Sequence, residues 1–253
     1  MADIPDHLSS ASQPTALGTA RSQARPLSRS LLVLLTCGTV GSLLFTITYL
    51  IEGAIRPDYN ALQQAVSALS LGPSGWVQQV NFVFFGLVTL AMAFIWRQIL
   101  KGGAGATWYP ILRSLEGLGL IVDGFFSQDP APGYPPGALL MPPTLHGTVH
   151  TLFAFVCITS IALGYFVLAR RFAQEPRWEW GWAIYAIISG LLTMILIALF
   201  GSLTAQHSPI AGLFERLATS GVSLPFGVIL LARVWLGTGF TSPAPGERRQ
   251  VNH

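Results

Sequence analysis

The chain has 253 residues, of which 51% are hydrophobic and only 10% are charged. Soluble domains carry about 25% charged residues, so this composition favours a protein that crosses a membrane several times. The net charge of +3 is small, and the arginines lie in scattered clusters without interleaved aromatic residues. We therefore expect no nucleic-acid partner, while membrane lipids are expected contacts and partner proteins stay unspecified.

The first 30 residues are rich in Ser, Ala, Thr and Gln and contain three prolines. Such a segment cannot bury a core, so we interpret residues 1–30 as a disordered cytoplasmic tail. We expect residues 237–253 to form a second disordered cytoplasmic tail. The membrane domain is then predicted to occupy residues 31–236, and its first apolar run is interpreted as an uncleaved signal anchor.

Six apolar runs follow one another within this region. Each is about 18 to 23 residues long, which is enough to cross about 30 Å of hydrocarbon. The sequence therefore predicts an all-α fold, a polytopic bundle of six transmembrane helices. The predicted spans are Leu31–Glu52, Trp76–Trp96, Tyr109–Phe126, Leu145–Ala169, Trp180–Leu203 and Leu213–Trp235.

The positions of the basic residues predict the orientation of the bundle. Twelve Lys and Arg residues fall on one side of the predicted membrane, whereas the other side has only Arg56 and Arg216. Short loops rich in Lys and Arg stay cytoplasmic, so both termini should be cytoplasmic. All seven tryptophans lie near predicted span ends, as expected for an interfacial aromatic belt.

The outer connections are longer than the cytoplasmic ones and carry most of the unusual residues. The connection from Asp129 to Pro143 is too rich in proline for a helix and is predicted to form a stiff lid. Asp129 either starts a turn before Pro130 or contacts substrate or metal from the lid. Pro225, in the middle of the sixth predicted span, predicts a kink.

Two histidines give the strongest indication of chemistry. His146 and His150 are four residues apart at the outer start of the fourth span, so a helix would place them on one face, one turn apart. Zinc takes at least three protein ligands, and the candidates for the third are His207 and Asp123. Such a site could activate water for attack on an ester or amide. The alternative is a structural network in which the histidines bind neighbouring helices and Asp123.

Two carboxylates lie in the third span, seven residues apart. Glu116 is one turn from Arg113, which predicts an ion pair between these two side chains. Asp123 is distant from that arginine and lies at a depth similar to that of His150, so we nominate it as a catalytic residue.

Three further outer residues are candidate site residues. Ser67 is either a nucleophile, which requires His146 or His207 beside it, or a cap for a short helical segment. Arg216 either neutralises an acidic side chain within the bundle or binds a lipid phosphate. Tyr59, together with Arg216 and Asp129, is a predicted substrate-binding residue.

Several short motifs resemble a bacterial membrane family known as domain of unknown function 998. They include Arg56-Pro57-Asp58-Tyr59, Leu71-Gly72-Pro73-Ser74-Gly75-Trp76, His146-Gly147-Thr148-Val149-His150 and Gly212-Leu213-Phe214-Glu215-Arg216-Leu217. The resemblance covers roughly residues 33–236 and implies a six-span protein of the bacterial cytoplasmic (inner) membrane without an established activity. A more distant analogy links Ser67, Asp123 and the paired histidines to the alkaline ceramidases and progestin-and-adipoQ-type receptors, a superfamily of membrane hydrolases around zinc.

Three functions are compatible with these patterns. The first is a metal-dependent hydrolase or transferase that acts on a lipid at the outer leaflet. The second is a small transporter or proton-coupled carrier with Glu116 and Asp123 as an acidic track. The third is a non-catalytic membrane protein that binds a lipid or a partner.

Overall fold

The computed structural model of the chain describes residues 27–131, 133–139, 142–175 and 178–236. Regular structure in these ranges is helical, apart from one isolated bridge between Ala131 and Tyr134. The all-α prediction is therefore confirmed. The elements are α1 (Arg29–Ile55), the 3₁₀ helix η1 (Val66–Ser70), α2 (Gly75–Ile99), α3 (Trp108–Phe125), α4 (Leu145–Gln174), α5 (Trp180–Ala205), α6 (Ala211–Arg216), the π-helical η2 (Leu217–Gly221) and α7 (Ser223–Trp235).

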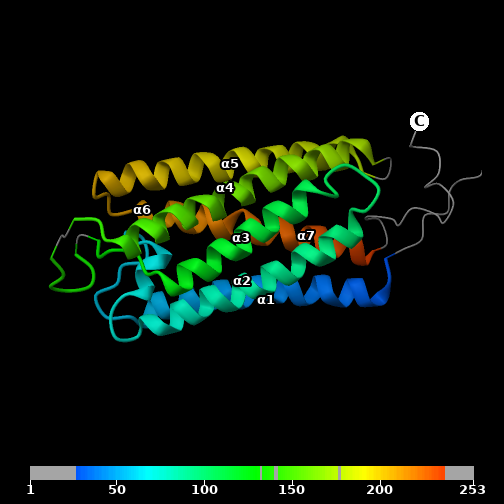
Figure 1. Cartoon of the computed structure of the whole chain (residues 1–253). Helices are drawn as coiled ribbons and strands as arrows, with labels where there is room; N and C mark the ends of the chain where they lie inside the picture. The colour runs from blue at the N-terminus through cyan, green and yellow to red at the C-terminus, as the bar shows by residue number, and fades with distance from the viewer. Residues whose placement is uncertain (1–26, 132, 140–141, 176–177, 237–253) are drawn as a thin grey trace, which may run out of the picture.

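The long helices form one elongated bundle in which sequential neighbours pack side by side (Figure 1). Contacts join α1 to α2, α2 to α3, α3 to α4 and α4 to α5, and the last segment returns to pack against α1. Most of the predicted tails at 1–30 and 237–253 lies outside the described residues, although α1 already begins at Arg29, where Ser28 accepts a hydrogen bond from Leu31 N as the N-cap.

Five helices of the described chain are long and apolar enough to cross a membrane: α1, α2, α4, α5 and the continuous segment Ala211–Trp235. The predicted spans within them agree with the observed helices to within a few residues at most ends. The third predicted span is a helix, but α3 is not among the five, since its 18 residues include Arg113, Glu116 and Asp123. We propose below that α3 also crosses the membrane.

The last span is not a uniform α-helix. Between α6 and α7 the chain makes a π-helical turn, in which Val222 N donates to Leu217 O at 3.0 Å. Pro225 follows shortly after, and a proline lacks the N–H that would bond to the carbonyl four residues earlier. The irregularity predicted at Pro225 is thus accommodated in the turn that precedes it.

Small residues let α2 and α3 approach closely. A Cβ atom on Gly86 would lie 2.7 Å from the carbonyl oxygen of Gly117, and one on Gly117 would lie 2.8 Å from the carbonyl oxygen of Gly86. Gly124 meets the carbonyl oxygen of Gln79 in the same way, at 2.8 Å. Backbone contact through small residues is typical of helices packed in a membrane, and it fixes α3 against α2 along its length.

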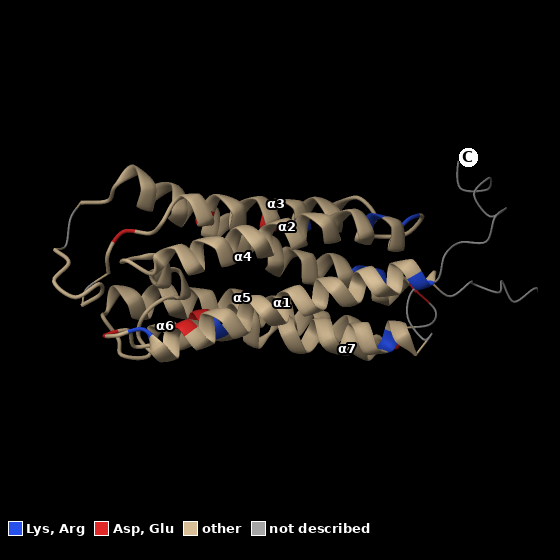
Figure 2. Cartoon of the chain, turned by 90° about the horizontal axis from the view of Figure 1, so that it is seen from below, with Lys and Arg blue, Asp and Glu red and all other residues tan. Residues whose placement is uncertain are grey.

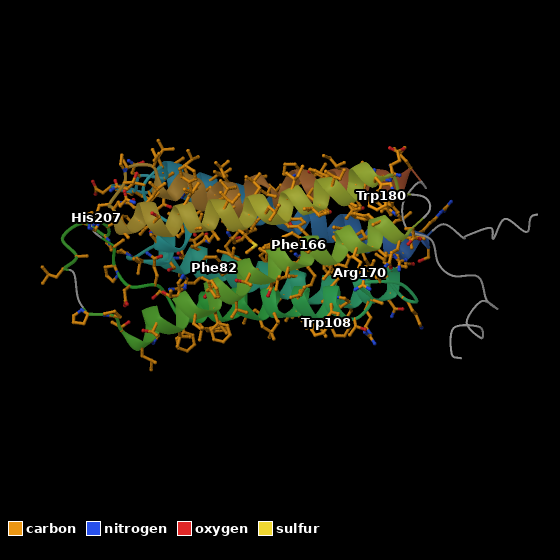
Figure 3. The ribbon with its side chains drawn as sticks, turned by 90° about the horizontal axis from the view of Figure 1, so that it is seen from above. Phe82, Trp108, Phe166, Arg170, Trp180 and His207 are labelled. Atoms are coloured by element: carbon orange, nitrogen blue, oxygen red, sulfur yellow. The ribbon has the colours of Figure 1, made fainter. Side chains whose placement is uncertain are left out.

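The polarity of the bundle is that of a membrane protein. Large apolar side chains such as Phe94, Phe155 and Ile188 point outward, while Gln78 and Thr89 are fully buried between the helices. Figure 2 shows Lys and Arg gathered at the end where α1 begins and α7 ends, with the acidic segments mostly toward the other end. In Figure 3, Trp108, Arg170 and Trp180 lie at the first of these ends and His207 at the opposite one. We refer to them as the basic end and the α6 end.

Candidate functional site

The interior of the bundle contains an elongated cavity of about 190 Å³. It is lined by α1, α2, α3, α4 and the last span, whereas no residue of α5 lines it. Its wall toward the basic end is mainly apolar and includes Met92, Trp96, Leu230 and Val234. Polar side chains gather at two levels, which we call the outer level, toward the α6 end, and the inner level, at Arg113 and Glu116.

Four residues from different elements form the outer level: Ser67, Asp123, His150 and Glu215. Asp123 lies in the last turns of α3 and His150 in the second turn of α4, so the antiparallel packing of these helices brings the two side chains together. Asp123 Oδ1 and His150 Nδ1 are 3.5 Å apart. The neighbourhood of Asp123 and His150 predicted from the sequence is therefore present.

The imidazole of His150 has a defined tautomer. Its Nδ1 lies 2.8 Å from the carbonyl oxygen of Phe126, and a carbonyl can only accept, so Nδ1 carries a proton. The ring is thus held by the end of α3. The side chain of Asp123, by contrast, is only 5% exposed, and its Oδ1 atom has no hydrogen-bond partner among the described residues.

The other two outer residues, Glu215 and Ser67, make hydrogen bonds that involve η1, in the connection between α1 and α2. Glu215 Oε2 accepts a hydrogen bond of 2.6 Å from Val66 N, the first residue of η1. Ser67 donates a hydrogen bond of 2.6 Å to Gln128 Oε1, and Ser70 donates to the carbonyl of Ser67. Ser67 therefore lies in a buried 3₁₀ helix rather than in an open loop, and its hydroxyl hydrogen is directed to an amide oxygen rather than to a histidine.

The inner level is an ion pair. Arg113 Nη1 lies 2.5 Å from Glu116 Oε2, as the three-residue spacing predicted. Glu116 is 2% exposed, and both side chains line the cavity, so this ion pair lies inside the bundle. Between the levels, a hydrogen bond of 3.1 Å joins the hydroxyls of Thr46 and Ser220 across α1 and the last span.

The loops at the α6 end close over the outer level. Tyr59 donates to the carbonyls of Gln64 and Ala65, and Arg216 donates to the Tyr59 hydroxyl and, at 2.8 Å, to the Gln64 carbonyl. Burial raises the pKa of Tyr59, so at neutral pH its hydroxyl keeps its proton and remains a donor. The ring of Tyr134, from the connection after α3, meets the Tyr59 ring edge-on at 5.3 Å.

Arg56 organises the connection after α1. It pairs with Glu52 at 2.5 Å and donates to the carbonyls of Leu69 and Leu71 at 3.1 and 2.9 Å. Glu52 is buried, so the arginine both neutralises it and holds the chain around η1.

The remaining predicted site residues are distributed over the α6 end. Asp129 accepts hydrogen bonds from Thr144 N and, at 2.5 Å, from Thr144 Oγ1, and Thr144 in turn caps α4. Arg216 binds carbonyls and a tyrosine hydroxyl, with no carboxylate among its hydrogen-bond partners in the described part of the chain. These residues hold the loops in place, while Asp123, His150 and Ser67 line the cavity.

The three predicted metal ligands are not assembled. His150 is buried, His146 is exposed beside the ring of Phe126 at 5.0 Å, and His207 is an exposed residue just after α5. Among the described residues, no group of three or more His, Cys, Asp or Glu side chains is arranged to hold a metal ion. The residues present therefore do not fit the zinc site that the sequence suggested, and zinc binding stays an untested prediction.

The fold and the cavity together define a class: a helical integral membrane protein whose bundle contains a mainly apolar cavity with a few ionisable side chains. Within this class the chain belongs to the family described as Protein of unknown function (DUF998), whose model matches residues 39–235. The resemblance inferred from the short motifs is thus confirmed. No curated protein and no solved structure matches the chain, and the analogy to alkaline ceramidases and progestin-and-adipoQ-type receptors is not supported.

Several residues of the site could not be selected from the sequence. Glu215 was visible beside Arg216, but nothing in its spacing connects it with Val66, which is 149 residues away. Gln128 and Tyr134 were equally inconspicuous. The one available signal for Glu215 is that a carboxylate at the start of an apolar span is costly and therefore points to a partner or a function.

Proposed function

We propose that this chain is a six-span protein of the bacterial cytoplasmic membrane, with both termini cytoplasmic, that binds one lipid or lipid-like amphiphile inside its bundle. A single observation carries the proposal: the cavity wall is mainly apolar, and its ionisable side chains are confined to the outer level toward the α6 end and to the Arg113–Glu116 pair. An amphiphile has the same division, since its chain gains from apolar burial and its head group needs polar partners.

The arrangement of α3 supports the sixth span. It packs against α2 and α4 over its length and runs between the two ends of the bundle (Figure 1). Its ionisable side chains line the interior cavity, where such groups are tolerated within a membrane. With α3 as a span, the Lys- and Arg-rich end is cytoplasmic by the positive-inside rule.

Cysteine accessibility tests this topology. In a background in which Cys37 and Cys157 are replaced by alanine, we expect His207→Cys to react with a membrane-impermeant maleimide on intact cells. Lys101→Cys should react only after the cells are opened. Both positions are exposed. His207 lies at the α6 end, whereas Lys101 lies in the short connection between the end of α2 and Trp108, which is at the basic end (Figure 3). Reaction of both residues from the same side would overturn the six-span topology.

Binding is supported better than hydrolysis. A serine hydrolase needs a base beside its nucleophile, and a metal hydrolase needs an assembled ligand set. Ser67 donates to Gln128, and the three histidines lie apart, so the geometry supports a binding cavity.

Photolabelling tests the binding function. A single-chain alcohol with a diazirine in its alkyl chain is incorporated into nanodiscs with the purified protein, and the labelled residues are mapped by mass spectrometry. We expect labels on cavity residues such as Leu120 and Leu230. Labels confined to lipid-facing residues would refute a binding cavity.

Two glycines provide a matched pair of variants. Gly227 lines the cavity, and a Cβ atom there meets nothing within 4 Å, so Gly227→Leu fills the space without a backbone clash. Gly201 on α5 is equally open but does not line the cavity. Cavity labelling should fall strongly in Gly227→Leu and persist in Gly201→Leu.

A carrier is the second candidate, favoured by the presence of ionisable side chains at two levels of one cavity. It predicts that protons cross the membrane together with the bound molecule. Proteoliposomes with an internal pH dye should then acidify or alkalise on addition of the amphiphile, and Asp123→Asn should abolish the signal.

A further inference from the structure

The outer level of the cavity has more hydrogen-bond acceptors than donors. Asp123 and Glu215 bring two carboxylates to it, and the side chain of Asp123 is almost completely buried. Asp123 Oδ1 has no hydrogen-bond partner in the described part of the chain. A buried carboxylate oxygen without a donor is costly, which indicates that a donor arrives from elsewhere.

The neighbouring donors are already engaged. His150 Nδ1 is held by the carbonyl of Phe126 at 2.8 Å, and Ser67 donates to Gln128. Val66 N is used by Glu215. None of these groups can satisfy Asp123 without giving up a hydrogen bond of its own.

Among the described residues, no Lys or Arg side chain contacts Asp123. Arg113 is the only Lys or Arg among the described lining residues, and it is paired with Glu116 at the inner level. Arg216, next to Glu215 in sequence, directs its Nη atoms to two carbonyls and the Tyr59 hydroxyl. The charge of Arg216 still acts on Glu215, so Asp123 is the outer carboxylate without a positive charge beside it among the described residues.

We propose that the outer level, centred on Asp123, recognises the protonated primary amine of a single-chain amphiphile whose alkyl part contacts the apolar wall of the cavity. An ammonium group supplies three N–H donors and a positive charge beside Asp123. A carboxylate or phosphate head group would meet two carboxylates and be excluded. This inference rests on the proposed binding function and specifies its ligand class.

Four diazirine probes with the same alkyl chain test the inference in nanodiscs containing the wild-type protein. Their head groups are a primary amine, an alcohol, a carboxylate and an ethanolamine phosphodiester, and the readout is labelling of cavity residues relative to lipid-facing ones. Because hydrogen bonds to a buried charge are the strong ones, we expect the amine to exceed the alcohol by about tenfold and the carboxylate to label least.

Substitution of Asp123 gives the second arm. Asp123→Asn keeps the shape of the side chain and removes its charge, so the preference for the amine should fall to about twofold or less. Asp58→Asn is the matched control, because Asp58 is exposed at the same end and does not line the cavity. It should retain the tenfold preference, and thermal unfolding of each variant identifies any loss of fold.

The outcomes separate this inference from the function on which it rests. Equal cavity labelling by the amine and alcohol probes would keep the binding function and overturn the recognition of an ammonium group. Preference for the phosphodiester probe over the free amine would overturn the single-chain amine as the ligand class. No cavity labelling by any probe would refute the binding function itself. An amine preference that survives in Asp123→Asn would overturn the role of Asp123.

Discussion

Oδ1 of Asp123 lies 3.5 Å from Nδ1 of His150, yet the Nδ1–H group of the imidazole donates its hydrogen bond to the carbonyl of Phe126, at 2.8 Å. The two side chains join α3 to α4 at the outer level of the cavity. The histidine is thereby oriented by the backbone, while the carboxylate keeps an oxygen without a donor. This division between a fixed group and an unsatisfied one is the basis of the proposed ligand site.

His150 should contribute to stability mainly through its Nδ1 donor. We expect His150→Ala to lower the free energy of unfolding by about 2 kcal/mol, because a buried carbonyl loses its donor and a cavity is left. His150→Asn places an amide N–H near the position of Nδ1 and should recover part of the loss. Thermal unfolding in detergent is the measurement.

His146 is the control for this comparison, since it is the neighbouring histidine of α4 and is exposed. His146→Ala should change the stability by about 0.5 kcal/mol or less. Equal losses in the two alanine variants would contradict the role assigned to His150.

Arg56 should be the most important polar residue of the first outer connection. Arg56→Ala leaves the buried Glu52 unpaired and frees the carbonyls of Leu69 and Leu71, so we expect a loss of about 3 kcal/mol. Arg56→Lys keeps the charge without the planar donor geometry, so its stability should lie between those of the wild type and Arg56→Ala.

Proteolysis of the same protein offers a second readout, because the connection around η1 should become a preferred cleavage site in Arg56→Ala. Arg97→Ala is the matched control variant. Arg97 makes one long hydrogen bond of 3.4 Å to Ala106 O and is exposed, so its removal should leave both readouts close to wild type.

The contact between Gly86 and Gly117 should tolerate no side chain. Gly86→Ala places a Cβ atom 2.7 Å from the Gly117 carbonyl oxygen, and backbone cannot yield as a flexible side chain can. We expect a loss of about 1 to 3 kcal/mol, measured by thermal unfolding. Gly181→Ala on α5, where a Cβ meets nothing within 4 Å, should be neutral or stabilising.

Removal of the Tyr59 hydroxyl tests the closure of the α6 end. Tyr59→Phe keeps the ring that packs on Tyr134 but removes the hydroxyl shared by Arg216 and the carbonyls of Gln64 and Ala65. We expect a loss of about 1 to 2 kcal/mol and faster amide hydrogen exchange in residues 59–66. Unchanged exchange in that segment would argue that the hydroxyl does not hold the connection.

The histidine pair shows that residue spacing did not predict which of the two side chains is buried. A four-residue spacing places His146 and His150 on one face of a helix, but it does not determine whether neighbouring helices cover that face at both positions. Because α4 begins at Leu145, His146 falls in its first turn, exposed at the end of the bundle, whereas His150 is already buried. The helix was predictable, but the depth at which its neighbours begin to cover it was not.

Local patterns in the sequence determined the helices, the basic end and the pairing of Arg113 with Glu116, because each depends on residues within a few turns of one another. Tertiary structure alone decided that Glu215 meets Val66, that Ser67 donates to Gln128 and that Asp123 is left unsatisfied. These contacts depend on the rotation and depth of each helix relative to its neighbours. Both are set by packing between distant segments, which no local period specifies.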